Sequence, residues 1–186
     1  GARPVSGGTD LVLDLARSSG PPVTLVDLSA IEGAREIAET DTGEFVLAGG
    51  VTHNQIVGDR RFRTFALPLA QACLEIGSPQ LRNRATIAGN LATASPANDS
   101  ISALMALDAT VVLSRLDSDT QDGLASREVR VADFFTGFRS TVCGPDELIT
   151  AIRVPKLRTT QRGIWVKLGL RRAQAISVVH AGMVID

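Results

Sequence analysis

Three short segments of the chain combine glycine with hydroxyl or amide side chains. They are Ser6-Gly7-Gly8-Thr9, Ala48-Gly49-Gly50-Val51-Thr52 and Thr86-Ile87-Ala88-Gly89-Asn90. Glycine adopts backbone conformations closed to other residues and lets a ligand approach the main chain closely. A turn that exposes consecutive N–H groups where a helix begins attracts phosphate. One such glycine turn is common, but three glycine-containing segments of this kind in a short chain indicate a site for a phosphate-bearing ligand. None matches the GxGxxG or GxxxxGK[ST] pattern, so neither a Rossmann site nor a P-loop is predicted.

The third segment extends into a longer stretch of small and polar residues, RATIAGNLATASPANDS, at positions 84–100. Alanine and glycine take little room there, and glycine and asparagine disfavour a helix. The polar side chains are Thr86, Asn90, Thr93, Ser95, Asn98, Asp99 and Ser100. We interpret the stretch as a cradle for a large ligand that carries hydroxyl and phosphate groups. The alternative is a long loop whose asparagine, serine and aspartate only cap the helix that follows.

The composition is that of an ordinary globular chain. Its 186 residues predict one domain or two small ones. A formal net charge of −1, without a long basic block, argues against nucleic acid or an anionic membrane as the main partner. No apolar run approaches the roughly 20 residues that span a bilayer. The chain begins at Gly1 without a methionine, so we expect an N-terminal piece to be missing.

The cysteines and histidines offer no metal site. Cys73 and Cys143 are far apart and form neither a CxxC motif nor a disulfide framework. They fit a reducing cytoplasm and are too few for an iron–sulfur cluster on this chain. His53 and His180 lack cysteine or acidic companions at ligand spacing, so no metal ligand is predicted.

Strands and helices alternate around the glycine segments. Apolar residues at helical spacing, such as Leu69 and Cys73, predict helices, and β-branched runs predict strands. Residues 23–28 are expected to form a buried strand, residues 117–127 a solvated loop and residues 156–162 a linker. The pattern predicts helices over 10–17, 65–76 and 100–107, a short polar helix from Asn54, a hairpin over 36–48, and strands over 110–113, 147–154, 164–170 and 176–185.

These motifs together resemble a known family. The stretch GSPQLRNRATIAGNLATASPANDS, with SGGTDL upstream, is similar to the FAD-binding subunit or domain of the molybdenum hydroxylases, the family of xanthine dehydrogenase and carbon monoxide dehydrogenase. The similarity covers nearly the whole chain, because VSGGTDL, AGGVTH, LMALDA, DFFTGFRST, DELITAIRVP and KLGLRRAQAISVV follow in the family's order. The central motif is highly specific.

The resemblance implies an α+β fold of the molybdopterin dehydrogenase type. In this fold two subdomains bind FAD between them, and a small C-terminal α+β domain follows. Residues 1–157 would form the FAD-binding domain, without its N-terminal segment. Residues 162–186 would begin the C-terminal domain of the flavin subunit.

The resemblance also implies which residues bind the cofactor. The first glycine loop would wrap the FAD pyrophosphate with backbone amides, Asn90 belongs to a T-I-G-G-N-like motif, and Asp99 would bond the ribityl and phosphate region. Ile76 and Lys167 would lie near the flavin ring. The complete set is Pro4, Val5, Ser6, Gly7, Gly8, Thr9, Asp10, Leu11, Ile76, Thr86, Gly89, Asn90, Thr93, Asp99, Ile149 and Lys167.

Two features depart from the family pattern. Ala88 stands where glycine is commoner, which is acceptable if its φ is negative. The chain has no tyrosine, so a tyrosine over the flavin ring has no equivalent.

The implied function is electron transfer. An oxidoreductase subunit of this kind takes electrons from iron–sulfur clusters in a partner chain and passes them through FAD to NAD+ or another acceptor, while the protein holds and tunes the flavin. The partners would be a large molybdopterin-binding subunit and a small 2Fe-2S subunit, in a cytoplasmic heterotrimer. Without them we expect no activity on an organic substrate. The alternatives are a stand-alone flavin oxidase of a related fold and a scaffold that has lost FAD.

Overall fold

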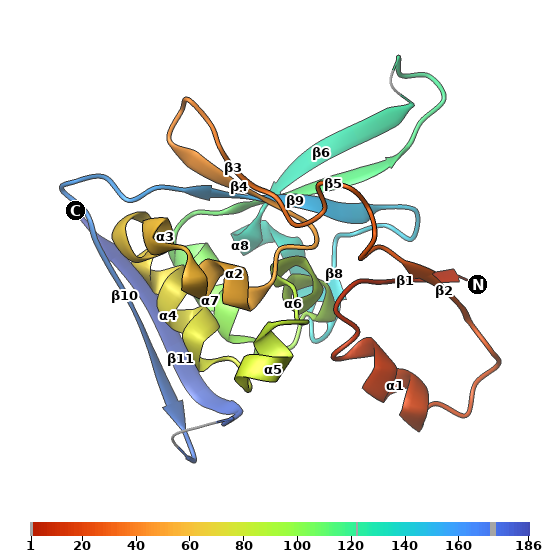
Figure 1. The fold of residues 1–186 in the computed structure, drawn as a ribbon, viewed down its shortest axis with the longest axis horizontal. Helices are drawn as coiled ribbons and strands as arrows, with labels where there is room; N and C mark the ends of the chain where they lie inside the picture. Colours follow the sequence, from red (N-terminus) through yellow and green to blue (C-terminus); the bar gives the residue numbers. More distant parts are fainter. Residues whose placement is uncertain (1, 122, 172–173) are drawn as a thin grey trace.

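A five-stranded antiparallel sheet carries the core of the molecule in the computed structural model (Figure 1). The structure describes residues 2–121, 123–171 and 174–186. The strand order β3-β4-β9-β5-β6 places the late strand β9 at the centre, between β4 and β5. The strands are β3 Ile37–Glu39, β4 Glu44–Ala48, β5 Thr110–Leu116, β6 Leu124–Arg130 and β9 Leu148–Pro155.

Helices cover one side of this sheet (Figure 1). They are α2 His53–Gly58, α3 Arg60–Phe65, α4 Leu67–Glu75, α5 Pro79–Arg82, α6 Ile87–Thr93, α7 Asp99–Ala106 and α8 Val131–Phe134. The core forms where the inward strand residues meet the helices. Phe45 of β4 stacks on Phe62 of α3 with ring centroids 4.4 Å apart, and both side chains are fully buried. None of the helices within the described ranges is long and apolar enough to cross a membrane.

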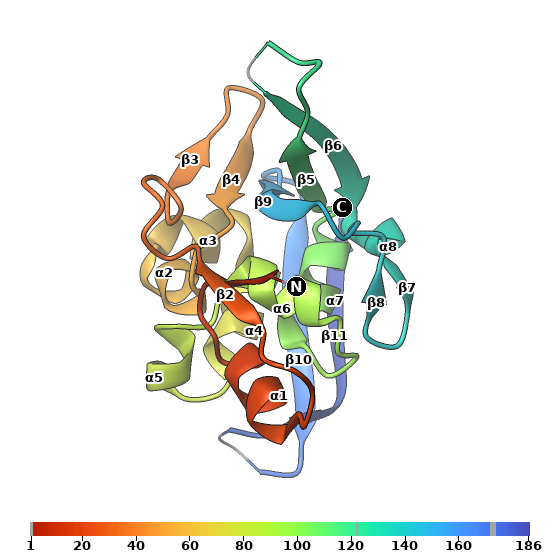
Figure 2. The ribbon, with the colours of Figure 1, turned by 90° about the vertical axis from the view of Figure 1, so that its right-hand side faces the viewer.

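The N-terminal residues form a small unit of their own beside this body (Figure 2). Strand β1 (Ala2–Val5) leads through helix α1 (Leu11–Arg17) to strand β2 (Thr24–Asp27), which pairs with β1 in parallel. The expectation of a buried strand over residues 23–28 is right about the strand and wrong about its burial, because all four residues of β2 are exposed. A two-stranded sheet beside one short helix offers too little surface to cover them.

A hairpin of β10 (Arg162–Gly169) and β11 (Ser177–Ile185) packs on the far side of helices α4 and α7 from the sheet (Figure 1). Trp165 is buried in this contact. Gly182 allows the close approach, because a Cβ there would lie 2.6 Å from the carbonyl oxygen of Ser102. A smaller hairpin joins β7 (Phe135–Gly137) to β8 (Ser140–Thr141).

The structure corrects the sequence-based elements in several places. The predicted loop over residues 117–127 is partly wrong, because β6 begins at Leu124 and pairs with β5. The stretch 84–100 is not one long loop, because α6 occupies its middle and includes Gly89 and Asn90. Helices α3, α5 and α8 and the β7–β8 hairpin are not predicted. The predicted helix over residues 65–76 is confirmed as the slightly shorter α4.

Candidate functional site

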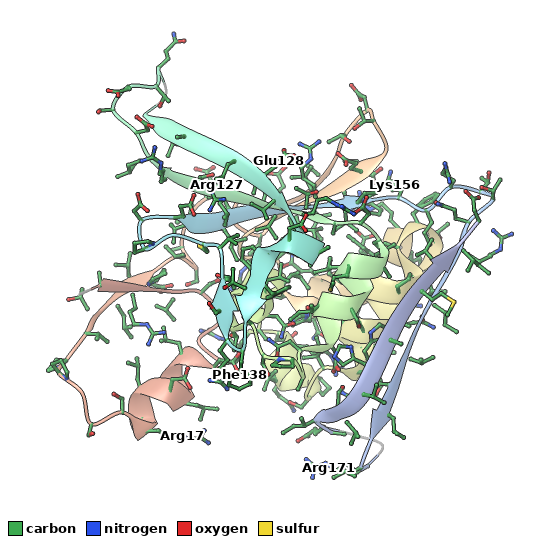
Figure 3. All side chains as sticks on the ribbon, turned by 180° about the vertical axis from the view of Figure 1, so that it is seen from behind. Arg17, Arg127, Glu128, Phe138, Lys156 and Arg171 are labelled. Carbon is green, nitrogen blue, oxygen red and sulfur yellow. The ribbon has the colours of Figure 1, made fainter. Side chains whose placement is uncertain are left out.

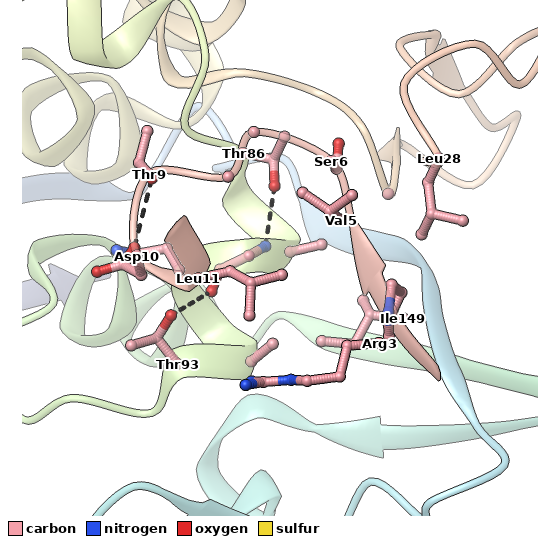
Figure 4. Close-up of a pocket in the computed structure, with 18 of the residues that line it drawn as sticks. Arg3, Val5, Ser6, Thr9, Asp10, Leu11, Leu28, Thr86, Thr93 and Ile149 are labelled. Carbon is pink, nitrogen blue, oxygen red and sulfur yellow. Dashed lines mark hydrogen bonds between the residues drawn. The ribbon is translucent and has the colours of Figure 1, made fainter. Parts of the chain in front are cut away.

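A cavity of about 570 Å³ lies between the N-terminal unit and the main body (Figure 4). Three parts of the chain supply most of its lining: β1 with the following loop and the start of α1, the stretch before and within α6, and the segment from Arg139 into β9. Leu28 and Gly49 complete the lining. All the predicted cofactor residues line this cavity except Ile76, Asp99 and Lys167. The volume falls in the range of about 300–1,000 Å³ that is usual for small-molecule sites.

The loop after β1 packs tightly against the segment before α6. A Cβ on Gly7 would lie 2.2 Å from the carbonyl oxygen of Arg84, so only glycine fits there. The Arg84 Nε donates to the Gly7 carbonyl oxygen at 3.4 Å. Gly8 has a φ of +75°, a left-handed conformation that favours glycine. The two glycines therefore let the loop turn closely over the main body.

The same loop leaves its backbone donors free. Within the described parts of the chain, the N–H groups of residues 6–10 donate to no protein acceptor, and each of these residues lines the cavity. Consecutive backbone N–H groups that lack protein partners are suited to bind an anion.

The second wall is held by bonds to the neighbouring glycine segment. Thr52 and Thr86 form an isolated antiparallel bridge, and the Ile87 N–H donates to the Val51 carbonyl oxygen at 3.0 Å. The Thr86 hydroxyl then accepts from the Gly89 N–H at 2.9 Å and caps α6 (Figure 4). Ala88 is helical and does not have a positive φ, so alanine fits where the family usually has glycine.

Asn90 presents a donor on this wall. Its Oδ1 accepts from the Ser100 hydroxyl at 2.5 Å, and its backbone carbonyl oxygen accepts from the Asn98 Nδ2 at 2.7 Å. The Asn90 Nδ2 has no partner among the described residues. The side chain is therefore oriented to donate to an acceptor oxygen of a ligand.

The third wall contains residues that the sequence does not identify. Arg139, Cys143 and Glu147 line the cavity beside the predicted Ile149. Arg127 and the Gly144 N–H lower the pKa of Glu147 to about 2. Burial and the nearby Glu147 charge raise the pKa of the Cys143 thiol, which argues against a reactive thiolate. Arg139 and Glu147 lie in the segments DFFTGFRST and DELITAIRVP that carry the family resemblance, but the sequence assigns neither of them, nor Cys143, to the site.

The other three predicted residues come together outside the cavity. The Lys167 Nζ donates to the Asp99 Oδ2 at 2.6 Å and to the Glu75 carbonyl oxygen, next to Ile76, at 3.4 Å. The Ser177 hydroxyl donates to the other oxygen of Asp99. The Lys167 and Asp99 side chains are 7% and 5% exposed. We call this group the Asp99 cluster; its polar atoms bind one another.

The histidine in the second glycine segment is sealed in the core. His53 Nδ1 lies 3.4 Å from the Cys73 Sγ, and no hydrogen-bond partner reaches its Nε2. Burial lowers the pKa of His53 to about 4, with a smaller contribution from Arg82, and burial raises that of the Cys73 thiol. Neither group reaches a ligand. The residues that the structure describes contain no His, Cys, Asp and Glu group that could hold a metal ion.

Comparisons with known proteins agree with this geometry. Residues 1–157 match the family model described as the FAD binding domain in molybdopterin dehydrogenase. The chain is 31% identical over 184 residues to the nicotinate dehydrogenase FAD-subunit of Eubacterium barkeri, which covers 97% of this chain and 60% of that protein. It is 32% identical over 155 residues to the carbon monoxide dehydrogenase medium chain of Afipia carboxidovorans, over 83% of this chain and 51% of the relative.

A solved crystal structure has a similar fold. The crystal structure of the Cu,Mo-CO dehydrogenase in its cyanide-inactivated form superposes with a TM-score of 0.87 and 29% sequence identity, over 100% of this chain and 62% of that one. The chain thus spans about half to three fifths of the length of these similar proteins.

Proposed function

The chain belongs to the family of FAD-binding domains of molybdopterin dehydrogenases, and from this premise we propose that it binds FAD non-covalently in the cavity and serves as the electron-transferring part of the medium subunit of a molybdenum hydroxylase. The observation that carries the proposal is the row of free amides at residues 6–10 along the cavity. FAD has a diphosphate that such amides can bind. The small residues Ala85, Ala88 and Gly89 leave room for it on the opposite wall.

Each wall has its own task in this proposal. The amides of residues 6–10 hold the diphosphate, and the Arg3 side chain lines the same cavity with a compensating positive charge. Thr86 and Gly89 hold the wall at the start of α6, and Asn90 donates from Nδ2 to a cofactor oxygen. Thr93 donates its hydroxyl to the Gly89 carbonyl oxygen at 2.9 Å and keeps an acceptor free. Ile149 supplies an apolar contact. When bound, FAD supplies the redox chemistry, accepting electrons from one partner and passing them to another.

The Asp99 cluster has a supporting role in the proposal. Asp99 lies in α7 next to Ser100, which orients Asn90. Lys167 and Ile76 contribute from β10 and from the end of α4. In this arrangement, the three residues reach the flavin ring only if the cofactor extends beyond the cavity toward them.

The partners and the acceptor follow from the family. We include in the proposal a large molybdopterin-binding subunit, a small 2Fe-2S subunit and NAD+ or another acceptor, in a cytoplasmic heterotrimer. The described chain has two cysteines, both free, so cluster ligands must come from elsewhere. Organic substrates would be oxidised in the large subunit.

The domain boundary is also part of the proposal. Residues 1–157 form the FAD-binding domain, and residues 162–186 begin a second domain. The outward side chains of the β10–β11 hairpin are apolar and uncovered: Ile164, Val166, Leu168, Val179 and Met183 are each about half exposed or more. A patch of this kind is typical of a surface that another element covers.

The test is a titration of the apo-protein with FAD, followed by flavin fluorescence and by calorimetry. We expect one FAD per chain, and we expect acid precipitation to release the flavin into the supernatant. A folded preparation that binds no FAD would contradict the proposal, and flavin retained in the pellet would contradict non-covalent binding.

A second assay separates the subunit from a stand-alone oxidase. The FAD-loaded chain is incubated with purines, aldehydes, N-heterocycles or carbon monoxide and a dye acceptor. We expect no turnover, with slow electron transfer from NADH to the dye at most. Rapid oxidation of any of these compounds would favour a stand-alone flavin oxidase.

A further inference from the structure

A carboxylate stands in the wall of the cavity that we assign to a diphosphate cofactor. Glu147 lines the cavity, and its side chain is only 9% exposed. A charged carboxylate there would repel a diphosphate, and the low dielectric of a partly enclosed site would strengthen that repulsion. A diphosphate can bind here only if another group neutralises the negative charge of Glu147.

Arg127 supplies the compensating charge from β6 (Figure 3). Its Nε donates to the Glu147 Oε1 at 2.6 Å, and its Nη2 donates to Oε2 at 2.8 Å. This bidentate pairing is the strongest geometry that arginine and a carboxylate form. The Gly144 N–H donates to the same Oε2 at 2.7 Å. Both Glu147 oxygens are thus occupied.

The same arginine also fixes the turn before β9. Its Nη2 donates to the Val142 carbonyl oxygen at 2.8 Å, on the other side of the turn from Glu147. Cys143 lies inside the turn, with its thiol 3.6 Å from the Glu147 carbonyl oxygen. The next residues, Leu148 and Ile149, line the cavity. Arg127 therefore binds the turn of the third wall at two points, Val142 and Glu147.

We propose that Arg127 is a positioning residue of the FAD site, which neutralises Glu147 and fixes the third wall so that the cavity accepts a diphosphate. This inference rests on the proposed function. Arg127 acts through Glu147 and does not itself line the cavity.

The matched control is another arginine of the same strand. Arg130 pairs with Asp108 at 2.6 Å, but these side chains are 60% and 67% exposed and neither lines the cavity. Exposed pairs of this kind contribute little. The control therefore removes an arginine and an ion pair from β6 without changing the cavity.

The experiment measures FAD affinity by fluorescence titration for the wild type, Arg127→Gln, Arg130→Gln, Glu147→Gln and the double variant Arg127→Gln/Glu147→Gln, with a thermal melt for each. We expect Arg127→Gln to weaken FAD binding on the order of tenfold, from one uncompensated charge. Arg130→Gln should bind as the wild type does. The double variant should regain most of the lost affinity, because it removes the carboxylate charge as well.

The pH profile provides a second readout. Without Arg127, the pKa of Glu147 should rise toward its ordinary value of about 4.3. Lowering the pH from 7 to 4.5 should then protonate Glu147 in part and strengthen FAD binding by Arg127→Gln relative to the wild type. The other titratable or charged groups around Glu147 are Arg115 of β5 and, in its own turn, Asp146 and the neutral Cys143 thiol. All of these groups remain in both proteins.

The outcomes separate this inference from the proposed function. A wild type that binds no FAD would overturn the function. A wild type that binds FAD while Arg127→Gln binds equally well would overturn the role of Arg127. A folded double variant as weak as Arg127→Gln, with no recovery at low pH, would show that the loss is not electrostatic and would overturn charge neutralisation by Arg127.

Discussion

The polar residues that line the cavity and those of the Asp99 cluster differ in what their polar atoms contact. The cavity has backbone donors at residues 6–10 and the Asn90 Nδ2 without protein partners. In the Asp99 cluster, both carboxylate oxygens and the Lys167 ammonium are already bound. We propose from this difference that the cavity takes an external ligand and that the contacts within the Asp99 cluster stabilise the fold. The stretch 84–100 contributes Asn90 to the first group and Asp99 to the second.

The largest expected effect on stability comes from breaking the Asp99 cluster. Asp99→Ala leaves the Lys167 charge buried without its partner, and we expect a loss of about 3–5 kcal/mol in the free energy of unfolding. Urea denaturation measures it, with Asp108→Ala as the exposed control, since the Asp108 side chain is 67% exposed. Equal losses for both variants would show that the Asp99 cluster is not a stabilising contact.

The pH dependence of stability tests whether His53 is buried as a neutral side chain. The pKa of His53 is about 4 in the folded chain and ordinarily 6.5. Between pH 4 and 6.5 the histidine is protonated in the unfolded chain but neutral in the folded chain. The free energy of unfolding should therefore fall as the pH decreases from 6.5 to 4. Above pH 6.5, the contribution of His53 should be constant. The loss is about 3 kcal/mol. Urea denaturation across this range should show a shallower pH dependence for His53→Gln, and an unchanged slope would contradict a buried neutral histidine.

A substitution in the loop after β1 should weaken FAD binding and leave the core intact. Gly7→Ala places a Cβ against the Arg84 carbonyl oxygen, and forced displacement of this kind costs about 1–3 kcal/mol. We expect FAD affinity to fall roughly 5- to 150-fold, as measured by fluorescence titration. Gly58→Ala is the control, because no atom lies within 4 Å of the added Cβ. Unaltered affinity in Gly7→Ala would place the ligand away from this loop.

The smallest expected difference is between two asparagines of the stretch 84–100, Asn90 and Asn98. Asn90→Ala removes a donor from the cavity and should weaken FAD binding by about 1–3 kcal/mol. Asn98→Ala should have a smaller effect, because the Asn98 side chain donates to the Asn90 backbone carbonyl oxygen and does not line the cavity. The two titrations are directly comparable. Equal affinities would mean that Asn90 does not touch the cofactor.

The sequence identifies the family and the glycine loops, because local composition carries both. It predicts that the stretch 84–100 contributes to a site, but not that residues 94–100 lie outside the cavity lining. Lys167 and Ser177 reach Asp99 from a hairpin whose position depends on tertiary packing. The pairing of Arg127 with Glu147 is not predicted for the same reason, since the two residues meet only after β6 and β9 join one sheet. Residue 172, which belongs to the basic pair after Leu170, lies outside the described residues.

The exposed strand β2 shows a further limit. A β-branched apolar run predicts a strand, but its burial depends on what packs against it, and β1 is the one strand that pairs with β2 in the described part of the chain. Composition alone cannot distinguish a central strand from one at the edge of a small unit.

The most direct measurement of the central claim is a crystal structure of the chain with FAD. The account predicts that the diphosphate oxygens lie within hydrogen-bond distance of the backbone N–H groups of residues 6–10, with the Asn90 Nδ2 donating to the cofactor and the Asp99–Lys167 pair intact. A diphosphate bound elsewhere, with residues 6–10 still unpartnered, would contradict it.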